Sequence, residues 1–478
     1  MSGPPGAGSW RFTERTAVLL FALARTVLCA YRAAVQSITV DEATTYLNYV
    51  RDHWANIWTN YDPNNHVLYS ILAQLSVRAL HISEFSLRLP SVLAGFFLVI
   101  GVHRVLEVTV GSSVIRWITL VAVSLAPMLL DFSVAARGYG LGVTLLVWAI
   151  SFSIRGRDLM AGIFAGLSMA ATFNVAFSVI GLVACPLLLG DGRLRTRLLR
   201  STSVAAPAGI ILFAICYPAI RQAHIDQFYV GLPTLREALY DFVSRTIRAV
   251  PGYGHGGWLG SAAAIRAIEY FLLPAVMLVV IAVSVRVFLR EKRSRRTLLP
   301  AFALILALAA IVASHIFLGL NYPIDRLWLH LFVLFALAWA IAASQISGPG
   351  MRIANGIVAI AMIAQFLTQF HTGYFALWIF DAPIKNMAQR VRGEVRSKPP
   401  GSLSLTGEWY HTPALQYYQH VYRLTALKPV ERSEITLLHG FDYYVLDTDV
   451  AATPEARRLI PIYKDHLSGV LLAQEPQP

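Results

Sequence analysis

The chain has 478 residues, of which 56% are hydrophobic and only 14% are charged, whereas soluble domains carry about 25% charged residues. Its mean hydropathy is +0.56. This composition excludes a mostly soluble enzyme, a disordered chain and a small disulfide-stapled domain. The net charge of +13 comes mainly from arginine clusters between apolar runs, a pattern typical of cytoplasmic loops and not of nucleic-acid binding. The sequence therefore predicts a mainly α, polytopic membrane protein.

Eleven apolar runs predict membrane-spanning helices, because a helix needs about 20 mostly apolar residues to cross a bilayer. In chain order these runs lie near 16–35, 89–107, 114–133, 139–154, 158–174, 175–190, 203–220, 263–285, 299–320, 328–344 and 353–372. A twelfth run, 65–80, is shorter and carries His66, Gln74 and Arg78. We expect this segment to dip into the membrane or to lie along it without crossing.

The basic clusters fall at every second loop and predict the orientation in the membrane. If they face the cytoplasm, the N-terminus is inside and the C-terminus is outside. The outer segments are then 36–88, 134–138, 221–262, 321–327 and the tail from about 373. We expect a multi-pass protein of a bacterial-type inner or plasma membrane.

The sequence predicts a transmembrane module, 1–380, and a polar extracytoplasmic domain, 381–478. In the second part, short β segments (402–405, 443–446 and 470–472) alternate with helical segments (413–422 and 455–466), which is typical of a small α/β domain. This domain also carries a group of aromatic residues that could stack on sugar rings or could form its core. They are Trp409, Tyr410, Tyr417, Tyr418 and Tyr422.

Two adjacent carboxylates, Asp41 and Glu42, follow the first predicted span directly. A carboxylate beside apolar walls can act as a general base toward an acceptor hydroxyl. The alternative interpretation is structural, with Asp41 capping a helix and both acids in its first turn.

Polar residues recur at the other outer segments. His66 follows the Asp62-Pro63-Asn64-Asn65 run, and it could bind a phosphate, position an acceptor or serve only as a satisfied polar residue. Arg137 and Arg326 lie outside, where arginine is less common, and a guanidinium can hold phosphate in a bidentate fork. Their nearby acids, Asp131 and Asp325, offer a salt-bridge alternative for each.

The segment 221–262 supplies further acceptor or loop candidates: His224, Asp226, Arg245, Arg248 and His255. Its glycine-rich part follows no predicted strand and has no Lys-Ser/Thr after it, so a nucleotide-binding loop is not predicted. The chain shows no Cys/His metal spacing, and the sequence requires no cofactor.

Several of these motifs together resemble the integral-membrane GT-C glycosyltransferases, within them the protein O-mannosyltransferase and lipid A aminoarabinose transferase group. The motifs are Asp41-Glu42-Ala43, Leu87-Arg88-Leu89-Pro90-Ser91, Ala136-Arg137-Gly138-Tyr139 and Tyr322-Pro323-Ile324-Asp325-Arg326. The resemblance covers about 36–345. It implies a polyprenyl-phosphate-linked sugar as donor and an acceptor on the non-cytoplasmic side.

This resemblance also implies residue roles. Asp41 matches the family's catalytic acid and Glu42 its neighbour, while Arg326 and Arg137, with Tyr322, Tyr139 and His66 beside them, match positions near the donor phosphate. The Asp62–His66 run departs from the aminoarabinose transferases, so the phosphate contact and the acceptor class can differ.

The predicted function is therefore an inverting membrane glycosyltransferase that transfers a hexosyl or pentosyl group from a polyprenyl phosphate to a glycan, lipid or protein of the cell envelope. A transporter or flippase for a phospholipid could use the same arginines without chemistry, although such proteins more often show paired repeats with broken helices. An assembly factor that recruits partners through its outer tail is a third class.

Overall fold

The computed structural model describes residues 7–59, 62, 64–190, 192–222, 230–248, 259–290, 292–346, 348–431 and 438–476. The chain groups into two compact units, and each is described by itself. Unit 1 comprises Met1–Cys29, Tyr61–Tyr69 and Pro90–Phe370. Unit 2 comprises Ala30–Asn60, Ser70–Leu89 and His371–Pro478. The domain boundary expected at residue 380 therefore lies inside unit 2, which also contains the segments around Asp41 and Arg88.

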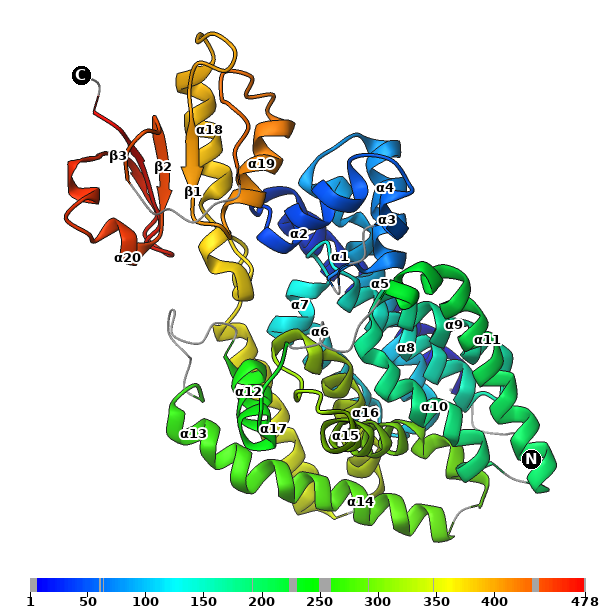
Figure 1. Ribbon diagram of the computed structural model, residues 1–478. Coiled ribbons are helices and arrows are strands. Elements are labelled where there is room, and N and C mark those ends of the chain that lie inside the picture. The colour runs from blue at the N-terminus through cyan, green and yellow to red at the C-terminus, as the bar shows by residue number, and fades with distance from the viewer. Residues whose placement is uncertain are drawn as a thin grey trace. The chain divides into compact units, whose positions relative to one another are not determined.

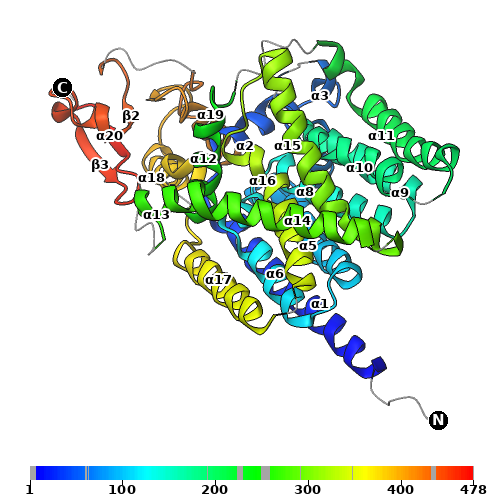
Figure 2. The same ribbon diagram turned by 90° about the horizontal axis from the view of Figure 1, so that it is seen from below.

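Unit 1 consists of helices (Figures 1 and 2). Two long helices, α1 (Ala7–Val35) and α5 (Glu84–Thr109), run from one unit into the other along the chain, and so does the shorter α4 (Val67–Leu80). The remaining α-helices of unit 1 are α6 (Ser113–Leu125), α7 (Pro127–Phe132), α8 (Gly138–Ile154), α9 (Asp158–Ala171), α10 (Ala176–Leu189), α11 (Leu194–Gln222), α12 (Leu235–Ile247), α13 (Ala262–Ala267), α14 (Leu273–Arg290), α15 (Leu299–Leu318), α16 (Leu329–Gln345) and α17 (Pro349–Thr368). Short 3-10 or π turns are η2 (Phe173–Val175), η4 (Ile268–Leu272), η5 (Lys292–Leu298) and η6 (Asp325–Trp328).

Six described helical segments are long and apolar enough to cross a membrane: Thr13–Val35, Glu84–Thr109, Leu194–Gln222, Ala262–Arg290, Arg295–Leu318 and Asp325–Gln345. The other expected spans form shorter apolar helices, so the predicted count of about eleven is not confirmed. The run 114–133, for example, is broken into α6 and α7. Its break lies at Ala126, whose extended backbone is favoured by the following Pro127.

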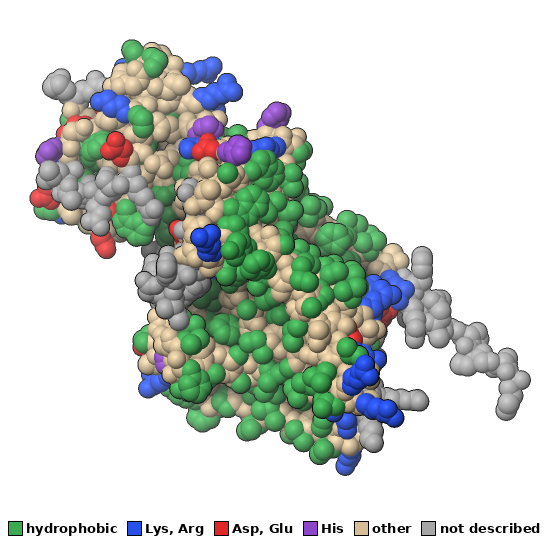
Figure 3. Space-filling model, turned by 45° about the vertical axis from the view of Figure 1, so that its right-hand side comes forward, with side chains coloured by type: hydrophobic (Ala, Val, Ile, Leu, Met, Phe, Trp, Pro, Cys, Tyr) green, Lys and Arg blue, Asp and Glu red, His purple; other side chains and the backbone are tan. Residues whose placement is uncertain are grey.

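Large apolar side chains lie on the surface of these helices, as the face shown in Figure 3 illustrates. Val27 is 70% exposed, Leu289 71% and Phe317 80%. A water-soluble domain rarely leaves so much contiguous apolar surface uncovered, whereas a bilayer covers it. The chain is therefore a multi-pass membrane protein.

Close backbone packing joins α9 to α11, while α9 also packs on α8 and α10 packs on α15. A Cβ at Gly162 would lie 2.4 Å from the carbonyl oxygen of Val204, and one at Gly166 would lie 2.7 Å from that of Ala208. Small residues at this four-residue spacing allow close approach of membrane helices, which have no hydrophobic driving force between them.

Unit 2 combines helical segments with a four-stranded sheet. Its helical elements are α2 (Val40–Thr45), η1 (Tyr46–Val50), α3 (Asn56–Thr59), η7 (Ala376–Asp381), α18 (Ile384–Val395), α19 (Thr412–Val421), α20 (Thr448–Ala451) and η8 (Ala456–Arg458). The strands are β1 (Leu405–Gly407), β2 (Tyr443–Leu446), β3 (Ile460–Lys464) and β4 (Leu471–Gln474). They lie in the order β1-β2-β4-β3, with β1 parallel to β2 and the other two pairs antiparallel.

The expected α/β character of the C-terminal segment is confirmed, but one of its helices was wrong. The range 455–466 forms one 3-10 turn and then β3. Pro461 is incompatible with a helix interior, and β4 provides the neighbouring strand to which β3 pairs.

The aromatic group of this domain divides into core and surface. Tyr417 and Tyr418 are fully buried, whereas Trp409 is 46% exposed. Core packing therefore accounts for the first two, while Tyr410 and Tyr422 are half-buried and Trp409 is the most exposed ring of the group.

Candidate functional site

Asp41 lies in the first turn of α2, a short helix with a capping box. The cap is Thr39 and not Asp41: the Thr39 hydroxyl accepts the N–H of Glu42, and the Glu42 carboxylate accepts the N–H of Thr39. These reciprocal bonds satisfy two donors that a helix start leaves open. The side chain of Asp41 is not used as the cap, and the residue is partly exposed although its Oδ2 atom is buried.

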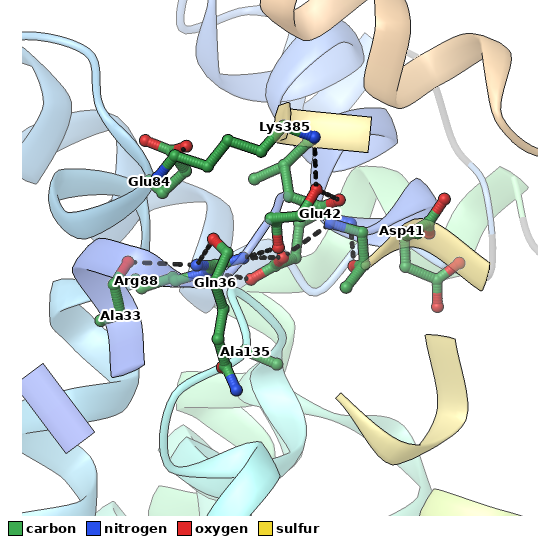
Figure 4. Close-up of polar contacts among 12 residues, drawn as sticks. Ala33, Gln36, Asp41, Glu42, Glu84, Arg88, Ala135 and Lys385 are labelled. Atoms are coloured by element: carbon green, nitrogen blue, oxygen red, sulfur yellow. Dashed lines mark hydrogen bonds and ion pairs between the residues drawn. The ribbon is translucent and has the colours of Figure 1, made fainter. Parts of the chain in front are cut away.

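Glu42 forms a buried ion pair with Arg88, which lies in the first turns of α5. The guanidinium Nε donates to Glu42 Oε1 at 2.8 Å and Nη2 donates to Oε2 at 2.6 Å, and neither side chain is exposed. Figure 4 shows the two neighbouring acids pointing apart, Glu42 toward Arg88 and Asp41 away from it. The bidentate geometry fixes the orientation of both partners.

Arg88 also holds the end of α1. Its remaining N–H groups donate to the carbonyl oxygens of Ala33 (3.1 Å), Gln36 (2.8 Å) and Ser37 (2.7 Å). Ala33 lies in the last turn of α1, and Gln36 and Ser37 follow it, in a region where carbonyl oxygens lack intrahelical donors. One buried side chain thus joins three elements, α1, α2 and α5, and the turn that carries Asp41 is rigidly supported.

The C-terminal segment of unit 2 contributes three further bonds: one to the end of α1, one to the connection between α1 and α2, and one to the start of α2. The ammonium of Lys385 donates to Ala34 O at 3.0 Å and the hydroxyl of Tyr418 accepts the N–H of Ile38 at 2.9 Å. Asp381 Oδ2 accepts the N–H of Val40, the first residue of α2, at 2.6 Å.

Asp381 is buried together with His411, and sequence analysis did not single out either residue. His411 Nδ1 lies 3.5 Å from Asp381 Oδ1. Burial raises the pKa of the Asp381 carboxyl from its ordinary 3.8 to about 6, while His411 and the Val40 N–H lower it and the charge of Asp41 raises it further.

In unit 1, two of the predicted arginines lie over one aromatic ring. The guanidinium carbons of Arg137 and Arg326 are 6.0 Å and 5.6 Å from the ring centroid of Tyr139, and Arg326 Nε donates to the Tyr139 hydroxyl at 3.1 Å. Arg137 is buried and donates to Asn64 Oδ1 at 3.1 Å, whereas Arg326 is partly exposed. We call Arg137, Tyr139, Arg326 and His66 the arginine site.

His66 joins this site through its ring, which packs on Tyr139 with centroids 4.6 Å apart. Its Nδ1 lies 2.9 Å from Ala171 O. Because a carbonyl only accepts, Nδ1 carries the proton. Burial and then the charge of Arg137 hold the pKa of His66 well below its ordinary value. The imidazole is therefore neutral near pH 7 and offers a hydrogen bond, not a charge.

Gly138 makes this arrangement sterically possible. A Cβ there would lie 1.9 Å from Ala171 O and 2.8 Å from His66 Cβ. The glycine of the Arg137-Gly138-Tyr139 motif thus lets the carbonyl that fixes the His66 proton approach α8.

The other predicted residues have different neighbours. Asp325 pairs with Arg245, Oδ1 to Nε at 2.5 Å, so this carboxylate has a close partner besides the adjacent Arg326. The ring of Tyr322 stacks on His315 with centroids 4.2 Å apart. Arg248 follows α12 as its C-cap residue. His224, Asp226 and His255 lie outside the described residues.

In the part of the chain that the structure describes, no group of three or more His, Cys, Asp or Glu side chains is arranged to hold a metal ion.

Comparison with solved structures identifies the fold. ArnT from Cupriavidus metallidurans, the lipid A aminoarabinose transferase, matches in its apo state with a TM-score of 0.53 and 10% identity, over 97% of this chain and 100% of that chain. Its structure bound to undecaprenyl phosphate matches with a TM-score of 0.53 and 12% identity, over 99% of this chain and 100% of that one. An oligosaccharyltransferase of Archaeoglobus fulgidus has a TM-score of 0.48 at 13% identity, over 96% of this chain and 73% of its own.

No protein-family model matches the chain, and no curated protein matches its sequence. The resemblance inferred from the motifs is nevertheless confirmed by the structural match over almost the entire chain. The chain therefore has the GT-C fold, the architecture of integral-membrane glycosyltransferases.

Proposed function

We propose that this membrane protein transfers a sugar from a polyprenyl-phosphate donor to an acceptor hydroxyl on the non-cytoplasmic side. The observation that carries the proposal is the first turn of α2 in unit 2, which we call the acid turn. In it Asp41 is partly exposed, while the adjacent Glu42 is held in a buried ion pair. A general base must be both accessible and held in a fixed orientation. The bound undecaprenyl phosphate of the ArnT structure supports a polyprenyl donor.

In the proposed reaction Asp41 accepts the proton of the acceptor hydroxyl. The acceptor oxygen forms a bond to the anomeric carbon from the face opposite the phosphate, the bond between that carbon and the phosphate oxygen breaks, and the anomeric centre inverts. Polyprenyl phosphate leaves with one more negative charge than it had as the diester. Arg326 is proposed to offset that charge, since charge-assisted bonds to phosphate are stronger than neutral ones.

Within the arginine site, Arg326 is the better candidate for direct phosphate contact. It is partly exposed and its orientation is fixed by the Tyr139 hydroxyl. The buried Arg137 adds positive charge beside the same ring. The neutral His66 suits a hydrogen bond to an uncharged group, such as a sugar hydroxyl, better than it suits phosphate.

The test uses the full-length chain reconstituted in vesicles with undecaprenyl-phosphate-linked hexoses and pentoses, and it measures release of undecaprenyl phosphate. Asp41→Asn is expected to lower turnover by ~10²–10⁴ with little loss of stability. The control is Asp52→Asn, which alters an acid that pairs with Arg51 on the surface. Transfer at the wild-type rate by a folded Asp41→Asn variant would remove Asp41 from the role.

A second experiment tests the phosphate site by measuring only the binding of undecaprenyl phosphate, without turnover. Arg326→Ala should weaken binding about 10-fold or more, since a hydrogen bond to a charged group contributes roughly 1.5–3 kcal/mol. Arg15→Ala, at an exposed side chain paired with Glu107, should leave binding unchanged. Movement of the lipid-linked sugar across the bilayer without cleavage would instead support the transporter alternative.

A further inference from the structure

We propose that Asp381 and His411, which the C-terminal segment of unit 2 supplies, are positioning residues for Asp41. The inference rests on the proposed function, because it treats Asp41 as the reacting base. It assigns to this segment a part in the chemical step that is separate from acceptor recognition.

The first link is the bond between Asp381 and the start of α2. Asp381 Oδ2 accepts the Val40 N–H at 2.6 Å, and Asp381 is 1% exposed. Val40 is the residue directly before Asp41. The first N–H groups of a helix have no partner within it, and a carboxylate there forms a short, charge-assisted bond. This bond fixes the Thr39–Val40 peptide group, one residue before Asp41, and so restrains the start of the helix turn that carries the Asp41 side chain.

The second link holds Asp381 itself. His411 Nδ1 lies 3.5 Å from the other carboxylate oxygen, and the ring is completely buried beside Phe380 and Tyr410. Apart from this contact with Asp381, neither ring nitrogen of His411 has a hydrogen-bond partner among the described residues. A buried imidazole that lacks hydrogen bonds costs stability, so packing alone does not explain a histidine at this place. Beside the carboxylate it restricts the rotation of Asp381.

Third, the residues just before α2 are also held by contacts that do not involve Asp381. Lys385 and Tyr418 hold Ala34 O and Ile38 N–H independently of Asp381, and Arg88 holds the end of α1. Loss of Asp381 should therefore loosen the first turn of α2 without unfolding unit 2. A displacement of about 1 Å at a catalytic group can lower a rate by about 100-fold, so a local change is enough to be measured as kcat.

The experiment compares Asp381→Ala with Asp381→Asn in the full-length chain. The amide oxygen of asparagine can still accept the Val40 N–H, whereas alanine cannot. We expect Asp381→Ala to lower kcat about 10- to 100-fold, with the KM for the undecaprenyl-phosphate-linked sugar used as donor changed less than about threefold. Asp381→Asn should recover most of the loss. His411→Gln, which keeps Asp381, should lower kcat several-fold.

The matched control is Asp442, which also accepts a backbone N–H, that of Ser404 at 2.7 Å, but beside the sheet of the same unit, directly before β1 and β2. Asp442→Ala should lower stability without a specific loss of kcat. Amide hydrogen exchange gives a readout that does not require turnover: peptides covering 37–45 should exchange faster in Asp381→Ala and not in Asp442→Ala.

Three outcomes overturn the inference: wild-type kcat in Asp381→Ala, equal kcat losses in the Ala and Asn variants, or unchanged exchange at 37–45. If Asp381→Ala does not fold, a His411→Gln variant with wild-type kcat overturns it as well. A wild-type protein that transfers no sugar refutes the proposed function instead, while the exchange measurement still tests whether Asp381 anchors α2.

Discussion

Removal of Arg88 is the perturbation for which the structure gives the clearest magnitude. The guanidinium makes five hydrogen bonds, two to the Glu42 carboxylate and three to backbone carbonyls at the end of α1. Arg88→Met keeps an apolar side chain of similar length and leaves a buried, uncompensated carboxylate and three carbonyls without this donor. Breaking a buried pair in this way costs about 3–5 kcal/mol.

The matched comparison is the pair between Arg15 and Glu107. Its N–O distance is 2.8 Å, close to the 2.6 Å of the buried pair, but its side chains are 66% and 31% exposed. Arg15→Met should therefore cost only about 0–1 kcal/mol. The difference between these two variants measures the effect of burial together with the three carbonyl bonds that Arg88 makes in addition to its ion pair.

The assay is thermal and denaturant unfolding of the purified full-length chain in one detergent. Arg88→Met and Glu42→Gln should both lower the free energy of unfolding strongly, and the double variant should lose less than the sum of the single losses because the two groups interact directly. An Arg88→Met variant no less stable than Arg15→Met would refute the assignment of Glu42 and Arg88 as the support of the acid turn.

Three other predictions follow from the described geometry. Gly138→Ala should weaken binding of undecaprenyl phosphate and lower stability, because a Cβ at this position overlaps a carbonyl oxygen; unchanged binding would mean that the packing there adapts. The pKa of Asp381 is raised to about 6 by burial, with His411 and Asp41 as nearby charges, so the folded state holds the proton more tightly than the unfolded state does. The wild-type chain should therefore lose stability relative to Asp381→Asn as pH rises from about 4 to about 6, and the difference should level off above that; a pH-independent difference would contradict the shift. Alkaline phosphatase fused after Pro478 should be active and a cytoplasmic fluorescent protein dark, whereas the reverse would place the tail inside.

Periodicity and apolar runs in the sequence predicted much of the fold because these signals are local. Most helices of unit 1 and strand β2 coincide with the expected segments, whereas α12 forms within 221–262, which was expected to be an outer loop. The failures have longer-range causes: Pro461 and the pairing partner β4 convert an expected helix into β3. The number of crossings was not confirmed because length and composition alone do not decide whether a short apolar helix spans a bilayer.

Only part of the candidate site could be predicted in the same way. The sequence alone does not show which of the adjacent acids Asp41 and Glu42 is buried. The difference comes from Arg88, which lies 46 residues from Glu42 along the chain and pairs with Glu42. Asp381 lies 341 residues from its partner Val40, and no local pattern signals that contact. The run from Leu87 to Ser91, one of the motifs that carry the family resemblance, was the one available signal for Arg88.

The contact of α9 with α11 through Gly162 and Gly166 has a consequence for how a lipid substrate reaches this protein. Backbones this close leave no room for an acyl or prenyl tail between the two helices. They also resist sliding, since any shift brings carbonyl oxygens against Cα atoms. The two helices should move as one rigid body during turnover, so a polyprenyl chain must enter unit 1 between other helices.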